Sequence, residues 1–243
     1  MALVDTHTHI DHYANPMNIA REYEANKIYT MFVTNLPELF LKHLKFYNSF
    51  KYIRLCLGYH PQLVMEYALD KELFKKCVHE TKYIGEVGLD FSGKISPKEI
   101  DTQTAAFKYI TSEEFNKGRI YSIHSRSAEE QVLDILIENK VKHAIFHWYS
   151  GKISTLKRIV EQGYYFSLNP KMLNSKKGKE IILSIPKHLI LFETDGPFAR
   201  RNKNVITPSQ IKDIYLEFES IIPDFEKVVF SNFRRILIEK DLT

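Results

Sequence analysis

The sequence has 243 residues, of which 44% are hydrophobic, and a formal net charge of +4 at pH 7. This length and composition suit one globular domain, residues 1–243, and no apolar run approaches the ~20 residues of a membrane-spanning helix. The mild positive charge is compatible with a polyanionic partner such as nucleic acid, and we expect no membrane association.

Short apolar runs alternate with longer amphipathic runs along the chain. The short runs are rich in Ile, Val, Tyr and Phe and predict strands at 3–7, 29–34, 52–57, 83–86, 120–123, 144–147, 164–168 and 189–193. The longer runs have helical periodicity, and several begin near a proline. They predict helices at 18–25, 37–48, 63–80, 97–117, 128–138, 153–162, 176–184, 208–221 and 224–239.

This alternation predicts an α/β fold, a (β/α)8 TIM barrel, with a doubly wound open sheet as the structural alternative. The barrel is favoured because the connections are short and because candidate metal-binding or catalytic residues stand at the C-terminal end of most of the strands. The C-terminal ends of barrel strands converge on one mouth, whereas those of an open sheet are spread along an edge.

The cysteines and the first residues bear on the compartment. Cys56 and Cys77 are too few for a disulfide framework and fall in apolar runs, so we expect buried thiols in a reducing environment. Met1 to Val4 lead directly to the charged Asp5, which argues against a signal peptide. We therefore expect a cytoplasmic protein.

Metal-competent side chains stand where predicted strands end. They are His7, His9, Glu86, His124, His147 and Asp195. Taken singly, each is more typical of a capped or hydrogen-bonded polar group. At one end of one barrel, however, four imidazoles and two carboxylates form a ligand set for one or two divalent metals, and burying so many polar groups without a use is costly.

Several motifs resemble the signatures of the TatD-family metal-dependent hydrolases, in the family's order. They are His7-Thr8-His9, Gly85-Glu86-Val87-Gly88-Leu89-Asp90, His124-Ser125-Arg126, His147-Trp148-Tyr149-Ser150-Gly151 and Glu193-Thr194-Asp195-Gly196-Pro197-Phe198. Gly58-Tyr59-His60-Pro61 resembles the family's G-x-H-P turn, and Ser231 to Ile236 resembles its C-terminal N-x-x-R segment.

This resemblance implies a TIM barrel with a two-metal site. It implies that His7, His9 and Asp195 hold one metal. It implies also that His124 and His147 hold the other, with Glu86 bridging the two. The implied activity is that of a nuclease, typically 3′→5′ trimming of single-stranded DNA, or sometimes RNA, with Mg²⁺ or another divalent ion.

The residues themselves agree with this chemistry. Two metals about 3.5–4 Å apart can activate a water and stabilise both oxygens of a phosphodiester displacement. Glu86 suits the bridge because a carboxylate has two oxygens, and we expect Asp195 to act as general base. Four imidazoles favour Zn²⁺ or Mn²⁺ over Mg²⁺, and all three ions remain open.

Five neighbouring residues are candidates for substrate contact or ligand support. Arg126 suits a phosphate, or else a structural ion pair, and His60 suits a phosphate or a leaving oxygen, or else a buried hydrogen bond. Asp90 can orient a ligand imidazole. Trp148 can stack on a base, or else pack at the barrel rim, and Arg200 can track a strand's backbone, or else be simply solvated.

Departures from the family pattern cluster near the expected mouth and affect substrate choice more than metal binding. Gln62 stands where a second His is frequent, and Trp148 stands where a Cys is common. Two alternatives remain open. One is a small-molecule hydrolase of the amidohydrolase kind, and the other, still a nuclease, is a subunit active only with a protein partner. The resemblance also includes compact TatD-like chains that are nuclease components of anti-phage systems such as the Qat type.

Overall fold

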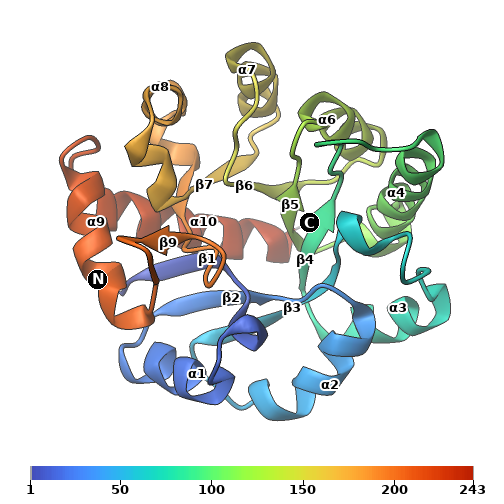
Figure 1. Ribbon diagram of the computed structural model, residues 1–243, viewed down its shortest axis with the longest axis horizontal. Coiled ribbons are helices and arrows are strands. Elements are labelled where there is room, and N and C mark those ends of the chain that lie inside the picture. The colour runs from blue at the N-terminus through green and yellow to red at the C-terminus, as the bar shows by residue number, and fades with distance from the viewer. Residues whose placement is uncertain (1, 243) are drawn as a thin grey trace.

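The computed structural model describes residues 2–242. Within this range, eight parallel strands follow one another in sequence order around a single sheet (Figure 1). They are β1 (Val4–Thr8), β2 (Tyr29–Val33), β3 (Ile53–Tyr59), β4 (Tyr83–Gly88), β5 (Ile120–His124), β6 (His143–His147), β7 (Tyr165–Leu168) and β8 (Ile190–Phe192). Each lies on a predicted strand, because short β-branched and aromatic runs fit a pleated, buried position.

The sheet closes on itself where β8 approaches β1. Regular pairing gives way there to the residues that follow β8: the Asp195 N–H donates to the His7 carbonyl at 2.9 Å, and the His9 N–H donates to the Gly196 carbonyl at 2.8 Å. An isolated parallel bridge joins Thr8 to Gly196. The (β/α)8 barrel is therefore confirmed over the open sheet, and its closing seam runs through residues predicted to bind metal.

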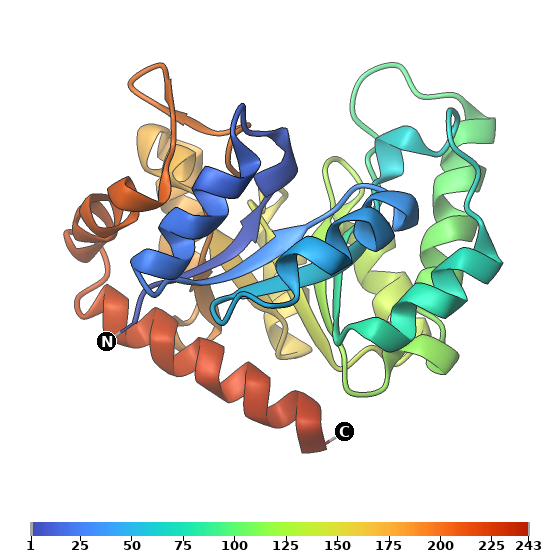
Figure 2. The same ribbon diagram turned by 90° about the horizontal axis from the view of Figure 1, so that it is seen from below.

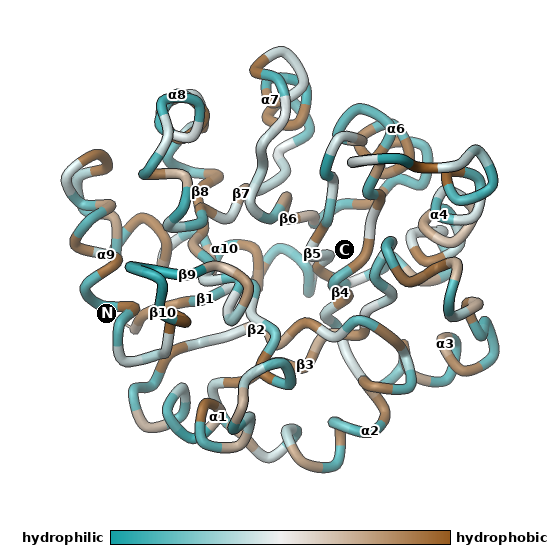
Figure 3. Tube along the Cα trace, viewed as in Figure 1, coloured by the Kyte–Doolittle hydropathy of each residue, from teal (hydrophilic) through white to brown (hydrophobic). Residues whose placement is uncertain are grey.

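Helices surround the barrel (Figure 1). They are α1 (Pro16–Ala25), α2 (Pro37–Tyr47), α3 (Lys71–Cys77), α4 (Pro97–Ile110), α5 (Glu113–Asn116), α6 (Glu129–Glu138), α7 (Ile153–Glu161), α8 (Lys176–Ser184), α9 (Ile211–Glu219) and α10 (Phe225–Leu242). Figure 3 shows hydrophobic and hydrophilic residues alternating along them, as expected for helices with one face against a barrel. No helix among residues 2–242 is long and apolar enough to cross a membrane.

The two ends of the barrel differ in what covers them. Figure 2 shows α10 lying across the end where β1 begins, and it contacts both β1 and β8. The loops after the strands rise at the opposite end, including the hairpin of β9 (Arg200–Arg201) and β10 (Asn204–Val205). The polar motifs of the sequence lie at this second end, in the last residues of the strands and in the loops that follow them.

The prediction of one helix at 63–80 is wrong. The structure has a 3₁₀ turn at Pro61–Leu63, then irregular chain, and α3 begins only after Asp70, whose Oδ1 accepts from the Leu73 N–H at 2.9 Å. This cap starts a new helix, which periodicity alone does not reveal. The helix predicted at 97–117 is likewise broken between α4 and α5. His143 is a buried residue at the start of β6.

Candidate metal centre

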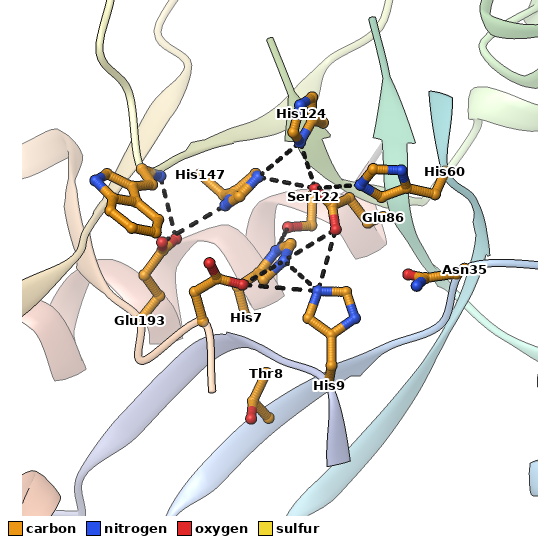
Figure 4. A network of polar contacts seen from close by, with 12 residues as sticks. His7, Thr8, His9, Asn35, His60, Glu86, Ser122, His124, His147 and Glu193 are labelled. Carbon is orange, nitrogen blue, oxygen red and sulfur yellow. Dashed lines mark hydrogen bonds and ion pairs between the residues drawn. The ribbon is translucent and has the colours of Figure 1, made fainter. Parts of the chain in front are cut away.

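The six residues predicted as metal ligands come together at the mouth of the barrel (Figure 4). They are supplied by β1 and the residue after it, by β4, by the ends of β5 and β6, and by the segment after β8. All six side chains are buried or nearly so, although every one of them is polar. Such burial requires partners that compensate for lost solvation.

The Glu86 carboxylate lies between two pairs of imidazoles. Its Oε2 is 3.4 Å from His7 Nε2 and 3.1 Å from His9 Nε2. We call this half of the centre, with His7 and His9, the β1 side. Its Oε1 is 2.6 Å from His124 Nδ1 and 2.9 Å from His147 Nε2. We call the half with His124 and His147 the β5–β6 side. Each oxygen thus faces a different pair, which is the arrangement that a carboxylate bridging two cations requires.

Asp195 approaches the β1 side. Its Oδ1 is 3.8 Å from His7 Nε2 and 3.7 Å from His9 Nε2. Its backbone has a φ of +48°, a left-handed conformation that costs energy in a residue other than glycine. Three backbone hydrogen bonds hold it there, one to His7 and two from Phe198 and Ala199. Burial raises the pKa of the Asp195 carboxyl well above its ordinary value.

The outer nitrogens of two imidazoles have partners that orient the rings. His7 Nδ1 lies 2.7 Å from the Ser122 hydroxyl, and His124 Nε2 lies 3.0 Å from Asp90 Oδ2. With protons on these outer nitrogens, His7 presents the lone pair of Nε2 and His124 that of Nδ1 to the centre. Asp90 therefore lies where the sequence placed it, beside a candidate ligand.

Glu193 lies behind His147 without a hydrogen bond to its ring, and it was not singled out from the sequence. It is fully buried, and its Oε1 lies 3.5 Å from His147 Nδ1. The Ser167 hydroxyl and the Trp148 N–H donate to its Oε2, and Asn169 Nδ2 donates to Oε1 at 3.2 Å. Burial would raise the pKa of this carboxyl, but the nearby imidazoles and the Ser167 hydroxyl lower it.

Asp5 is a second buried acid that the sequence analysis did not assign. Its Oδ2 accepts from the Tyr23 hydroxyl at 2.6 Å and from Thr194 Oγ1 at 2.7 Å, and its Oδ1 accepts from the Thr194 N–H at 2.9 Å. Burial raises the pKa of Asp5 to about 6, although these hydrogen bonds act to lower it. The carboxyl ties β1 to the segment carrying Asp195, so it fixes the spacing between ligands from opposite ends of the chain.

The donor chemistry fits divalent metals. Nε2 atoms of His7 and His9 lie only 3.3 Å apart, and both face carboxylate oxygens of Glu86 and Asp195. Burial lowers the pKa of His7 to about 4 and also lowers that of His9, so these imidazoles are neutral at pH 7. The lone pairs of His7 and His9 therefore converge on the carboxylate oxygens of Glu86 and Asp195, which is a donor set that suits a divalent cation.

Four overlapping groups of ligand atoms within residues 2–242 could hold a cation, among them His60, Glu86 and His124, and two of the four share His7. The atoms of each group lie within 4.8 Å of one another: His7, His9 and Asp195 in one, and His7, Glu86 and His147 in another. Burial would raise the pKa of Glu86, but the imidazoles of His60, His147 and His7 lower it well below its ordinary value. Glu86 is therefore a carboxylate ready to bind metal.

His60 lies beside the centre but differs from the four ligand candidates. Its Nε2 is 3.4 Å from Glu86 Oε1, while its Nδ1 accepts a hydrogen bond from the Gln62 N–H at 3.2 Å. Because Nδ1 uses its lone pair there, the proton of the neutral ring sits on Nε2, which can donate to a substrate oxygen.

The other substrate candidates take different places around a cavity of about 560 Å³ at the mouth. Arg126 and Trp148 both line it. Arg126 is exposed, and no ion pair to it occurs among the residues that the structure describes, so the alternative of a structural ion pair is not seen. Arg200 is exposed on β9. It is not one of the described residues that line the cavity.

Comparisons with known proteins agree with this geometry. A family model described as TatD-related DNase matches residues 4–238. The uncharacterized metal-dependent hydrolase YabD of Bacillus subtilis is 27% identical over 255 residues, covering 98% of this chain and 96% of YabD. Human deoxyribonuclease TATDN3 is 29% identical over 174 residues, 65% of this chain, which span only 62% of that protein.

A likeness in structure extends over nearly the whole chain. The crystal structure of YJJV, a TatD homologue from Escherichia coli, matches with a TM-score of 0.82 and covers 98% of this chain and 95% of that one. At 17% sequence identity, the likeness concerns the fold, and it is the barrel described above.

Proposed function

The chain belongs to the TatD-related DNase family, and from this premise we propose that it is a two-metal exonuclease that removes nucleotides from the 3′ end of single-stranded DNA. Its class, a metal-dependent hydrolase among deoxyribonuclease relatives, follows from family membership. The substrate strand, the direction of cutting and the roles of individual residues are our proposal.

The observation that carries the proposal is the position of Glu86. One of its oxygens faces His7 and His9, and the other faces His124 and His147, all within 3.4 Å. Two divalent ions bound on these two sides would polarise the phosphate and lower the pKa of a water molecule. The cavity of about 560 Å³ beside them lies in the usual range, roughly 300–1,000 Å³, of small-ligand sites.

The chain's own groups would divide the remaining work. Asp195, whose carboxyl has a raised pKa, would accept a proton from the attacking water. His60 would donate a hydrogen bond from its Nε2–H to the leaving oxygen, because its Nδ1 accepts from the Gln62 N–H. Arg126, exposed at the cavity and free of an ion pair among the described residues, would neutralise a phosphate.

Cleavage of end-labelled oligonucleotides tests this proposal. Single-stranded DNA and RNA of the same sequence are incubated with wild type, Asp195→Asn and Asp213→Asn over a titration of Mg²⁺, Mn²⁺ and Zn²⁺. We expect a ladder that shortens from the 3′ end, a loss of about 10²–10⁴-fold in Asp195→Asn, and full activity in the matched control, whose Asp213 is exposed on α9. Metal-loaded wild type that leaves both strands intact would refute the proposal.

A further inference from the structure

One part of the cavity has no role in the reaction described so far. It is formed by Phe198, which follows the Asp195 segment, and by Asn35, which follows β2; both line the cavity. His12, from the 3₁₀ turn after β1, contacts both of them. We call these three residues the His12 wall.

Phe198 presents an aromatic surface at this wall. The side chain is 55% exposed, although its backbone is fixed by the N–H that donates to the Asp195 carbonyl at 2.9 Å. Its ring meets that of His9 edge-on, with centroids 5.0 Å apart, and that of His12 at a tilt of 54°. Among the described residues, no ring is stacked parallel on Phe198, so a ring face is available to a planar ligand.

Asn35 presents a hydrogen-bond acceptor at the same wall. Its carbonyl accepts from the His60 N–H at 2.9 Å, and its Nδ2 lies 3.3 Å from His12 Nε2. Its Oδ1 is buried and finds no hydrogen-bond partner within residues 2–242. Figure 4 shows Asn35 near His60 and His9, at the rim of the metal centre. A buried acceptor without a partner is costly, so the Asn35 amide gains by turning toward a donor that a ligand supplies in the cavity it lines.

We propose that Phe198 and Asn35 form a subsite for the nucleobase of the nucleotide being removed. The base stacks on the Phe198 ring, and Asn35 Oδ1 accepts a hydrogen bond from an exocyclic amino group, as in cytosine or adenine. The inference rests on the proposed nuclease function and extends it. It assigns a base-recognising wall next to His9, and it makes the terminal base a determinant of the rate.

The subsite can be tested by binding, without turnover. Titration calorimetry compares dCMP with 2-deoxyribose 5-phosphate, which keeps the phosphate and lacks the base. We expect wild type to bind dCMP about 5- to 150-fold more tightly, the range that stacking of one base gives. Phe198→Ala should bring the ratio close to one, and Phe198→Trp should restore it. The matched control Phe46→Ala, exposed on α2, should keep the wild-type ratio.

Cleavage kinetics then separate this inference from the function on which it rests. Oligonucleotides that end in deoxycytidine, thymidine or an abasic residue are compared for wild type, Phe198→Ala and Asn35→Leu. Wild type should remove deoxycytidine fastest and the abasic residue slowest, and Asn35→Leu should lose the preference for deoxycytidine over thymidine. Equal rates for all three ends, or a dCMP ratio unchanged in Phe198→Ala, would overturn the subsite and leave the nuclease standing. No cleavage of any end would refute the nuclease and the subsite with it.

Discussion

The two sides of Glu86 use the same kinds of ligand in different surroundings. On the β5–β6 side, both imidazoles are backed by carboxylates, Asp90 behind His124 and Glu193 behind His147, and the pKa of each imidazole is raised despite burial. A ligand imidazole backed by a carboxylate is a stronger base and holds its metal more tightly.

On the β1 side, the ion pairs of His7 and His9 within the described residues are to Glu86 and Asp195 in the centre, and Asp11 is a further carboxylate near His9. His7 is backed by the hydroxyl of Ser122. Neither His9 Nδ1 nor, on the other side, His147 Nδ1 has a hydrogen-bond partner among the described residues, but His147 Nδ1 faces a Glu193 carboxylate oxygen at 3.5 Å. Burial lowers the pKa of both rings. The two sides of the bridged centre therefore differ in the groups that back their imidazoles. We expect the β5–β6 side to have the higher affinity for a divalent ion and to fill at the lower metal concentration.

The largest effect is expected from Glu86→Gln, which removes the feature that the two sides share. Losing the bridging charge should weaken metal binding on both sides and lower nuclease activity by at least about 10³-fold, since the chemistry depends on both ions. Metal content by mass spectrometry and the rate on single-stranded DNA measure this. Glu161→Gln, on the exposed end of α7, is the matched control. Two tightly bound metals in Glu86→Gln would contradict the shared bridge.

A smaller, one-sided effect is expected from Glu193→Gln. The amide keeps the size of the side chain but removes the charge behind His147, so affinity on the β5–β6 side should fall about 10–100-fold. Calorimetric titration with Mn²⁺ should show the tighter of two binding steps weakened and the other nearly unchanged. A thermal melt confirms that the variant folds, and equal weakening of both steps would mean that the two sides are not distinct.

The smallest effect is expected from Ser122→Ala on the β1 side. A neutral hydrogen bond contributes about 0.5–1.5 kcal/mol, so the weaker binding step should lose only about 2- to 10-fold in affinity. The same titration measures it, with Ser184→Ala on α8 as the control. A loss larger than that of Glu193→Gln would reverse the proposed ranking of the two sides.

Much of this centre could be predicted from the sequence because its signals are local. An apolar run followed at once by His or Glu marks several of the strand ends, and eight apolar runs with helices between them indicate a barrel. His60 of the G-x-H-P turn, a candidate for substrate contact, lies 3.4 Å from Glu86, and its role stays a prediction.

The supporting residues were missed because their partners lie far away in the chain. Asp5 bonds to Thr194, 189 residues on, and Glu193 bonds to Ser167 and Asn169 of another strand end. The one signal available was an acidic residue inside or beside an otherwise apolar strand, which is costly to bury unless paired. The false helix at 63–80 shows the opposite limit, since periodicity continued through a loop that Asp70 ends with a cap.

The most direct test of the account is to locate the metals. Anomalous diffraction from crystals soaked in Mn²⁺ should show two peaks about 3.5–4 Å apart, one on each side of the Glu86 carboxylate. The peak near His124 and His147 should reach full occupancy at the lower Mn²⁺ concentration. A single peak, or two peaks that Glu86 does not join, would contradict the bridged two-metal centre.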